Sequence, residues 1–216
     1  MRTYILPLGL FTLSCASVAQ GGLLEPISID RHVRALRGSE ILQYGTGVDP
    51  FSATVTSPDG LCTASQNSTI TVDTISITGS ASGYGTASLG SLAGSYLQEK
   101  FILMSRIPYR FSLEWSMNND ESSMVSVHLT GPSGDIFREF RDYGNGTWTS
   151  RGYLDPGQYD YYVNGGTSAY PDYGWTWPSM SFSAEFSLTP EPATLALAAL
   201  GALALMRRPR VHKETR

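Results

Sequence analysis

Residues 181–188 read Ser-Phe-Ser-Ala-Glu-Phe-Ser-Leu, a strict alternation of polar and apolar side chains. An alternation of period two places the apolar residues on one face, as in a β-strand that is buried on one side. The same period occurs at residues 69–78, 110–116 and 124–130, which are rich in Thr, Val, Ile and aromatic residues. We therefore expect strands at all four segments, and we find no convincing amphipathic helix after residue 50.

Turn-forming residues lie between the expected strands. Clusters of Asn, Asp, Gly, Pro and Ser occur at residues 118–120, 131–134, 144–146 and 155–157. Short strands separated by turns at this spacing are typical of antiparallel sandwiches and jelly rolls. The predicted fold class is therefore all-β, with a β-sandwich or jelly-roll-like ectodomain over residues 51–189.

The stretch at residues 152–159, Gly-Tyr-Leu-Asp-Pro-Gly-Gln-Tyr, supports a Greek-key sandwich. Pro156 and Gly157 predict a tight turn before a late strand. Tyr159 is then expected to cross the corner of the sandwich, with its hydroxyl bonded to nearby backbone. We interpret this stretch as folding chemistry and not as a binding site.

The first 19 residues have the pattern of a secretory signal peptide. A positive start at Met1-Arg2 precedes an apolar segment at residues 5–13, and Ser17-Val18-Ala19 predicts cleavage before Gln20. The rival interpretation is a lipoprotein signal cut before Cys15, but the residues ahead of this cysteine lack the aliphatic side chain that such signals carry. We therefore expect an exported protein.

The region after the signal peptide, residues 20–50, is expected to form an N-terminal arm. Residues 25–43 within it are the one charged stretch with helical character. The whole chain has a net charge of −4, which becomes about −8 once both terminal segments are set aside. This charge argues against binding to nucleic acid or to anionic membrane surfaces.

The two cysteines do not predict a disulfide framework. Cys15 leaves with the signal peptide, so Cys62 has no partner within the chain. Stability must then come from a hydrophobic core. Cys62 is either a small buried hydrophobe or the site of an intermolecular cross-link.

The last 27 residues, 190–216, combine three features of a membrane-sorting tail. Pro190-Glu191-Pro192 favours extended backbone, residues 193–206 form an apolar run, and an arginine-rich segment follows. As a helix the run spans roughly 21 Å, which is shorter than the hydrocarbon core of a bilayer. The arginines extend this span by snorkelling to the headgroups, and we expect the basic end to stay in the cytoplasm.

This arrangement resembles the PEP-CTERM sorting signal of exported bacterial proteins. The residues that carry the resemblance are Pro190, Glu191, Pro192, Arg207 and Arg208. The resemblance implies recognition by exosortase, a membrane transpeptidase-like enzyme, and cleavage close to the Pro-Glu-Pro motif. It also implies transient anchoring in the inner membrane through residues 193–206, followed by a location on the cell surface or outside the cell. Proteins of this family are associated with extracellular polysaccharide and biofilm. The β-rich region at residues 109–188 also resembles the ectodomains that often precede such tails.

Catalytic motifs are sparse in the exported region. It contains no Gly-x-Ser-x-Gly, no Gly-rich phosphate loop and no His-Glu-x-x-His motif. Two carboxylate groupings could be arranged as in glycosidases, namely Glu114 with Asp120-Glu121 and Glu139 with Asp142. These acids lie beside turns or on outward positions of strands, so we expect no catalytic residue and no enzyme.

Metal ligands are equally sparse. His32 and His128 lie far apart in the sequence, and neither has a Cys, Asp or Glu at metal-ligand spacing. Asp155, Asp160 and Asp172 are candidates for a structural Ca²⁺ site, although they lack the order of an EF-hand. Apart from this candidate, we expect no metal and no cofactor.

Ten Tyr and Trp residues between Tyr143 and Trp177 provide the candidate binding site. Sugar rings stack on exposed aromatic rings, whereas the same rings in a core only stabilise the fold. The candidate carbohydrate platform is the loop that contains Tyr170, Tyr173, Trp175 and Trp177. We expect Trp177 to pack against the sandwich and Trp175 to be at least half exposed.

The sequence thus predicts a non-enzymatic surface or matrix protein that exosortase sorts and cleaves. The alternative is a carbohydrate-binding module that uses the aromatic loop at residues 170–177. An enzyme that acts on glycans is a third hypothesis, and it requires carboxylates that converge in a cleft.

Overall fold

The computed structural model describes residues 24–85, 90–118, 122–169 and 177–189, which form twelve strands in two antiparallel sheets. Sheet A consists of β1 Glu25–Arg37, β2 Ser39–Gly45, β6 Ser91–Leu103, β8 Ser123–Gly131, β9 Gly134–Arg141 and β11 Gly157–Ala169. Sheet B consists of β3 Phe51–Thr56, β4 Thr63–Ile70, β5 Thr74–Ser82, β7 Ile107–Met117, β10 Asn145–Leu154 and β12 Ser179–Leu188. The strand orders are β2-β1-β6-β11-β8-β9 and β10-β7-β12-β5-β4-β3.

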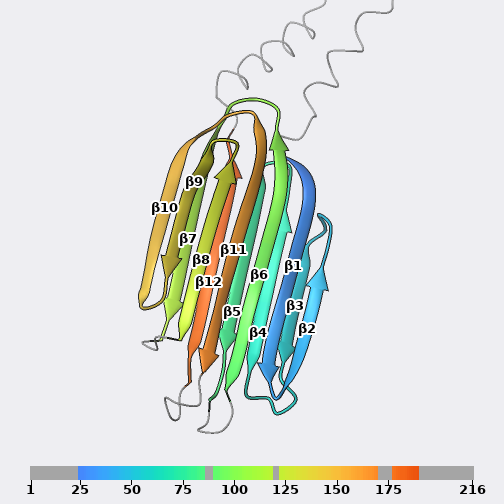
Figure 1. Cartoon of the computed structure of the whole chain (residues 1–216), viewed down its shortest axis with the longest axis vertical. Coiled ribbons are helices and arrows are strands. Elements are labelled where there is room, and N and C mark those ends of the chain that lie inside the picture. The colour runs from blue at the N-terminus through green and yellow to red at the C-terminus, as the bar shows by residue number, and fades with distance from the viewer. Residues whose placement is uncertain (1–23, 86–89, 119–121, 170–176, 190–216) are drawn as a thin grey trace, which may run out of the picture.

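The two sheets stack face to face, with the core between them (Figure 1). The β-sandwich predicted from the sequence is therefore confirmed. The signal peptide predicted for residues 1–19 and the helix predicted for residues 193–206 lie outside the described residues. Within the described ranges, no helix is long and apolar enough to cross a membrane.

Aromatic rings join the two sheets across the core. The Phe111 ring of sheet B lies 6.2 Å from the Tyr161 ring of sheet A, and Phe186 lies 5.5 Å from the same tyrosine ring. Burial of each such side chain stabilises the fold by about 1.5 to 3 kcal/mol. In β12, all four apolar residues of the alternating stretch face this core, as the sequence predicts.

The prediction of an N-terminal arm at residues 20–50 is wrong from residue 25 to residue 45. These residues form β1 and β2, and β1 pairs with β6 over most of its length. The apolar alternation of β1 is hidden in the sequence because Arg31 and Arg37 occupy inward positions beside Val33 and Ala35. Because charged residues occupy inward positions, the sequence of this core strand lacks the polar and apolar alternation that predicts a half-buried strand.

A second correction concerns residues 69–78, which the alternation predicts as one strand. The chain instead ends β4 at Ile70 and begins β5 at Thr74. Between them Thr71 Oγ1 donates to Asp73 Oδ1 at 2.8 Å, and the backbone N–H of Thr71 donates to the carbonyl of Thr74 at 2.8 Å. These turn bonds reverse the chain although the β-branched pattern continues through it.

The tyrosine corner is confirmed. The hydroxyl of Tyr159 donates to the carbonyl of Asp155 at 2.6 Å, and only 2% of the residue is exposed. Its ring stacks on that of Phe101, with the centroids 5.5 Å apart. Gly157 has a φ of 149° in this turn, and a Cβ there would lie 2.3 Å from Pro132 Cγ, so the position requires glycine.

Tyr159→Phe in the full-length chain is expected to lower the free energy of unfolding by about 1 to 3 kcal/mol, because the Asp155 carbonyl then loses its buried donor. Chemical denaturation measures the difference. Tyr153→Phe is the matched control, because Tyr153 is exposed and its hydroxyl is not involved in the corner. Equal stability of Tyr159→Phe and the parent would contradict the corner assignment.

Cys62 is a buried, unpaired thiol. Its Sγ donates to the carbonyl of Leu92 at 3.2 Å, and burial raises the pKa of the thiol. This environment agrees with a small buried hydrophobe and disfavours an intermolecular cross-link, which needs an exposed thiolate.

Among the described residues, three charged side chains are buried, namely Arg31, Arg37 and Glu99. Arg31 Nη2 donates to the carbonyls of Gly47 and Asp49 at 2.7 and 2.9 Å, whereas its Nε has no hydrogen-bond partner within the described residues. Arg37 donates to the Asp59 carboxylate and to the carbonyl of Tyr84. Glu99 of β6 lies directly opposite Tyr161 of β11, and neither of its oxygens has a hydrogen-bond partner within the described residues. Burial raises the pKa of Glu99 to about 8, so its carboxyl is neutral in the folded protein at pH 7.

Candidate functional site

A hollow of about 570 Å³ lies on the outward face of sheet A, over β6, β8, β9 and β11. The alternation of the strands places Gln98, Asp160, Tyr162 and Asn164 on this face. Met124 and Phe140 at its edge are 40% and 53% exposed. We call this feature the sheet A hollow. Its size and its mixture of exposed apolar groups with a few polar side chains are typical of small-molecule binding sites.

A hydrogen-bonded chain fixes the polar side chains of the sheet A hollow. The Tyr96 hydroxyl donates to Gln98 Oε1 at 2.8 Å, and Gln98 Nε2 lies 2.9 Å from each carboxylate oxygen of Asp160. Lys100 Nζ lies 3.9 Å from the same carboxylate and offsets its charge. Asp160 is thereby held as an oriented hydrogen-bond acceptor for a ligand that carries hydroxyl groups.

Four aromatic rings lie in a row on the same face. His32 stacks on Tyr96 with centroids 4.4 Å apart, and Tyr44 and Tyr162 meet this pair edge-on at 5.7 and 5.3 Å. Burial lowers the pKa of His32, which favours its neutral form. Of the four rings, Tyr162 lines the sheet A hollow.

The aromatic residues predicted from the sequence divide between the core and the surface. Tyr159 and Tyr161 are buried, Trp148 packs on Phe111 at 5.5 Å, and Tyr143 and Tyr153 are exposed. The core interpretation therefore holds for Tyr159, Tyr161 and Trp148, whereas sugar binding by the exposed rings stays a prediction.

The candidate platform at residues 170–177 is described only at Trp177. This residue is 61% exposed, and its ring stacks on the ring of Tyr84, a buried residue of the sandwich, with centroids 4.1 Å apart. Trp177 therefore contacts the sandwich through one face of its ring, while more than half of the residue stays exposed. Asn118 holds the backbone here, because its Nδ2 donates to the carbonyl of Trp177 and its Oδ1 accepts from the N–H of Ser179. Tyr170, Tyr173 and Trp175 lie outside the described residues.

The carboxylates considered for glycosidase chemistry are dispersed. Glu114 lies on the outward face of sheet B, and Asp120 and Glu121 lie outside the described residues. Glu139, in sheet A, forms an ion pair with Arg141. Asp142, which was considered together with Glu139, is exposed just after the end of β9. The grouping of Glu114 with Asp120-Glu121 lies partly outside the described residues.

The candidate Ca²⁺ ligands have other partners. Asp155 lies 3.5 Å from Arg106 Nε, Asp160 belongs to the sheet A hollow, and Asp172 lies outside the described residues. His128 bonds to Asp135 at 2.9 Å on the surface. Among the residues that the structure describes, no three His, Cys, Asp or Glu side chains are grouped to hold a metal ion.

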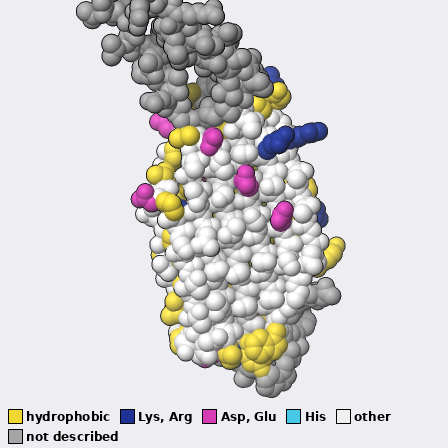
Figure 2. All heavy atoms as spheres, turned by 180° about the vertical axis from the view of Figure 1, so that it is seen from behind, with side chains coloured by type: hydrophobic (Ala, Val, Ile, Leu, Met, Phe, Trp, Pro, Cys, Tyr) yellow, Lys and Arg dark blue, Asp and Glu magenta, His cyan; other side chains and the backbone are white. Residues whose placement is uncertain are grey.

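The outward face of sheet B differs sharply from that of sheet A, because serine and threonine occupy most of its outward positions. Figure 2 shows it as a broad uncharged polar area with few charged side chains. The strand registers align these side chains in rows. One row crosses all six strands through Thr54, Ser65, Ser80, Ser181, Ser116 and Asn145. We call this outward surface of sheet B the hydroxyl face.

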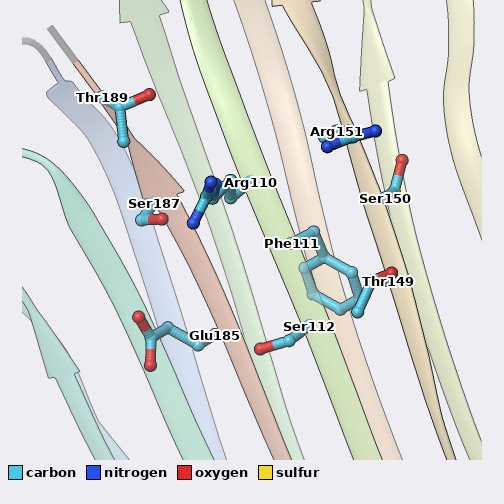
Figure 3. Close-up of a pocket in the computed structure, with 9 residues that line it drawn as sticks. All are labelled: Arg110, Phe111, Ser112, Thr149, Ser150, Arg151, Glu185, Ser187 and Thr189. Carbon is cyan, nitrogen blue, oxygen red and sulfur yellow. The ribbon is translucent and has the colours of Figure 1, made fainter.

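A groove of about 670 Å³ lies at one end of the hydroxyl face, over β7, β10 and β12 (Figure 3). Its charged residues are Arg110, Arg151 and Glu185. Thr189, the residue after β12, also lines it. Neither the groove nor the sheet A hollow was predicted from the sequence, because each is formed by strands that are not consecutive in the chain.

The comparisons with known proteins address the tail. Residues 188–211 match the family model of the PEP-CTERM protein-sorting motif. No curated protein matches the chain.

Solved structures with detectable similarity are only distantly alike. A ruminal GH26 endo-beta-1,4-mannanase shares 13% identity over 45% of this chain and 18% of that chain, with a TM-score of 0.26. The enzymatically active domain of bacteriophage CBA120 tailspike protein 4 shares 13% identity over 73% of this chain and 19% of that chain, with a TM-score of 0.30. The GH31 alpha-xylosidase from Xanthomonas citri shares 9% identity over 77% of this chain and 18% of that chain, with a TM-score of 0.26. The match thus spans less than a fifth of each of these longer chains, and at these scores it carries no argument about function.

The family match begins at Leu188, the last residue of β12, so the sandwich leads directly into the matched segment. The five residues predicted to form the sorting motif all lie within this segment. The chain is therefore an exported-type protein that carries a PEP-CTERM sorting motif at residues 188–211.

Proposed function

We propose that this chain is a non-enzymatic protein of the cell surface or extracellular matrix, which exosortase cleaves at its tail and which associates with exopolysaccharide. The observation that carries the proposal is the PEP-CTERM motif at residues 188–211. The fold is compatible with release of the tail. The N–H of Leu188 donates to the carbonyl of Asp73, and that of Thr189 donates to the carbonyl of Pro108, so the sandwich is closed before Pro190. Cleavage near Pro190 leaves all twelve strands in the released protein.

The proposed association with polysaccharide is supported by the sheet A hollow. An oriented carboxylate beside exposed apolar side chains suits a sugar, which presents hydroxyl groups at its edges and C–H groups on its faces. Phe140 and Tyr162 are the rings on which a sugar would stack, and Asp160 accepts from its hydroxyls. The loop at residues 170–177 is the alternative location, and the exposed ring of Trp177 supports it.

The protein that the native host releases is expected to lack both the signal peptide and the segment after the Pro-Glu-Pro motif. Intact-mass measurement checks this. Glu191→Ala should leave the tail attached, because it removes the charged residue of the motif. Glu214→Ala is the matched control, because Glu214 lies beyond the matched segment and its loss should leave processing unchanged. A released form that still contains residues 207–216 would refute the cleavage.

A further inference from the structure

Two arginines face each other on the hydroxyl face. Arg110 of β7 and Arg151 of β10 are direct cross-strand partners on the same side of sheet B. In an antiparallel pair, directly opposite residues have Cα atoms about 4.5 to 5.5 Å apart, and like charges at such positions destabilise the sheet. Within the described residues, neither arginine has an ion pair or a hydrogen-bond partner. This pair of arginines therefore does not stabilise the fold. We take this as an indication that the two guanidinium groups bind a ligand.

The arginines belong to a groove that has a floor of small hydroxyl side chains. Ser112 and Thr149 are the cross-strand neighbours next along β7 and β10, and Ser187 lies opposite Arg110 on β12. The contrast in length between these residues and the flanking arginines produces a hollow of about 670 Å³ (Figure 3). This volume is in the range of sites that hold one or two sugar units.

The charges in and around the groove select the ligand class. Two guanidinium groups bind carboxylates through paired N–H donors, and the hydroxyls add further donors and acceptors. Glu185 lines the same groove and Glu114 lies on the same face, so a dense polyanion such as nucleic acid is repelled there. The net charge of −4 of the whole chain has the same effect. A polymer whose carboxylates are separated by neutral sugars fits this groove, because the arginines attract the carboxylates and the glutamate lies beside uncharged sugars.

We propose that the groove between Arg110 and Arg151 binds the carboxylate of a uronic-acid-containing polysaccharide, and that the adjoining rows of the hydroxyl face hold its neighbouring sugars. Glu185 accepts hydrogen bonds from sugar hydroxyls. Rows of hydroxyls recur about every 4.8 Å across the strands and about every 6.8 Å along them, a spacing that offers repeated partners to an extended chain. The proposal rests on the exopolysaccharide association proposed above for its biological setting, but it concerns the opposite face of the sandwich.

Binding of the full-length protein to immobilised hyaluronan tests the proposal, because every second sugar of this polymer carries a carboxylate. Dextran is the neutral comparison and dextran sulfate the comparison for another anion. We expect clear preference for hyaluronan over dextran, and no stronger binding to dextran sulfate. The Arg110→Ala/Arg151→Ala variant should bind hyaluronan roughly 10- to 100-fold more weakly. Its melting temperature should not fall, because the like-charge pair is removed.

Two control variants separate recognition from general attraction. Arg34→Ala/Arg138→Ala makes the same change in net charge on sheet A, on the other side of the sandwich, and should bind hyaluronan within about twofold of the parent. Arg110→Lys/Arg151→Lys keeps the charge but loses the planar fork, so its affinity should lie between those of the parent and the alanine variant. Equal losses in the alanine variant and in the Arg34/Arg138 control would overturn the proposal, as would unchanged binding by the alanine variant.

The outcome also distinguishes this proposal from the function proposed above. Phe140→Ala disturbs only the sheet A hollow. If it abolishes dextran binding while the arginine variants have no effect on any polymer, the function stands and the arginine groove is refuted. If Phe140→Ala leaves binding to every polymer unchanged and the arginine variants weaken hyaluronan binding, the proposal for the groove is supported and binding in the sheet A hollow is refuted. Failure of the parent to bind any polymer would refute both.

Discussion

Phe182→Ala is expected to lower the free energy of unfolding of the full-length chain by about 3 to 5 kcal/mol. Only 4% of Phe182 is exposed, and its ring lies between the two sheets. Two glycines make room for it, Gly79 beside it in sheet B and Gly165 opposite it in sheet A. A Cβ at either glycine would lie 2.4 Å from Phe182 Cε1. Because the ring fills space that both sheets leave open, its removal creates a cavity that the backbone cannot close.

A double-mutant cycle shows whether this fit is specific. Gly165→Ala alone should cost about 1 to 3 kcal/mol, because the added methyl group forces the Phe182 ring to move. In the Phe182→Ala background the same change should cost much less or even stabilise, because the methyl group enters the cavity. Chemical denaturation of the parent, both single variants and the double variant gives the coupling. Additive costs would show that Gly165 and the ring of Phe182 do not meet.

Glu99→Gln is expected to stabilise the protein strongly above pH 8. The folded-state pKa of about 8 is raised from the ordinary value of 4.5 because the carboxyl is buried without a hydrogen-bond partner, and the nearby charge of Arg31 offsets this rise only in part. Between these values the unfolded chain is ionised and the folded chain is protonated, so unfolding releases a proton. The stability of the parent should therefore fall as the pH rises from about 4.5 to about 8, by up to about 1.4 kcal/mol per pH unit for this group. Glutamine removes this loss.

Urea denaturation at pH 5, 7 and 9 measures the effect of Glu99→Gln. The difference between variant and parent should be small at pH 5 and reach several kcal/mol at pH 9. Glu185→Gln is the control, because it makes the same change of side chain at an exposed position on the hydroxyl face. Parallel pH profiles for Glu99→Gln and the parent would mean that the carboxyl is ionised in the folded state.

The sequence predicts the fold wherever local chemistry is unambiguous. The alternation that ends β12 and the corner at Tyr159 both follow from side chains within a few residues of one another. The prediction fails at β1 because Arg31 faces inward, where its Nη2 donates to carbonyls 16 and 18 residues away in the sequence. It fails at Thr71 because a turn held by side-chain hydrogen bonds shares its composition with the strands around it.

The candidate sites are harder to predict because they depend on which strands become neighbours. Arg110 and Arg151 are 41 positions apart in the chain, and nothing local to either residue indicates that they meet. The sheet A hollow similarly needs β6, β8 and β11 side by side. A large aromatic residue such as Trp177 indicates a candidate site from the sequence alone, whereas serine and threonine at alternate positions indicate only a strand.

The position of β12 has a mechanical consequence. This strand is hydrogen-bonded on one side to β5 and on the other to β7, and the sorting tail continues from its end. Backbone hydrogen bonds in antiparallel sheets run perpendicular to the strands. A pull on the tail along the strand therefore loads both ladders in shear, so that many bonds must break together and not one after another. In the proposed anchored state, the sandwich should therefore resist tension better than a domain tethered through an edge strand.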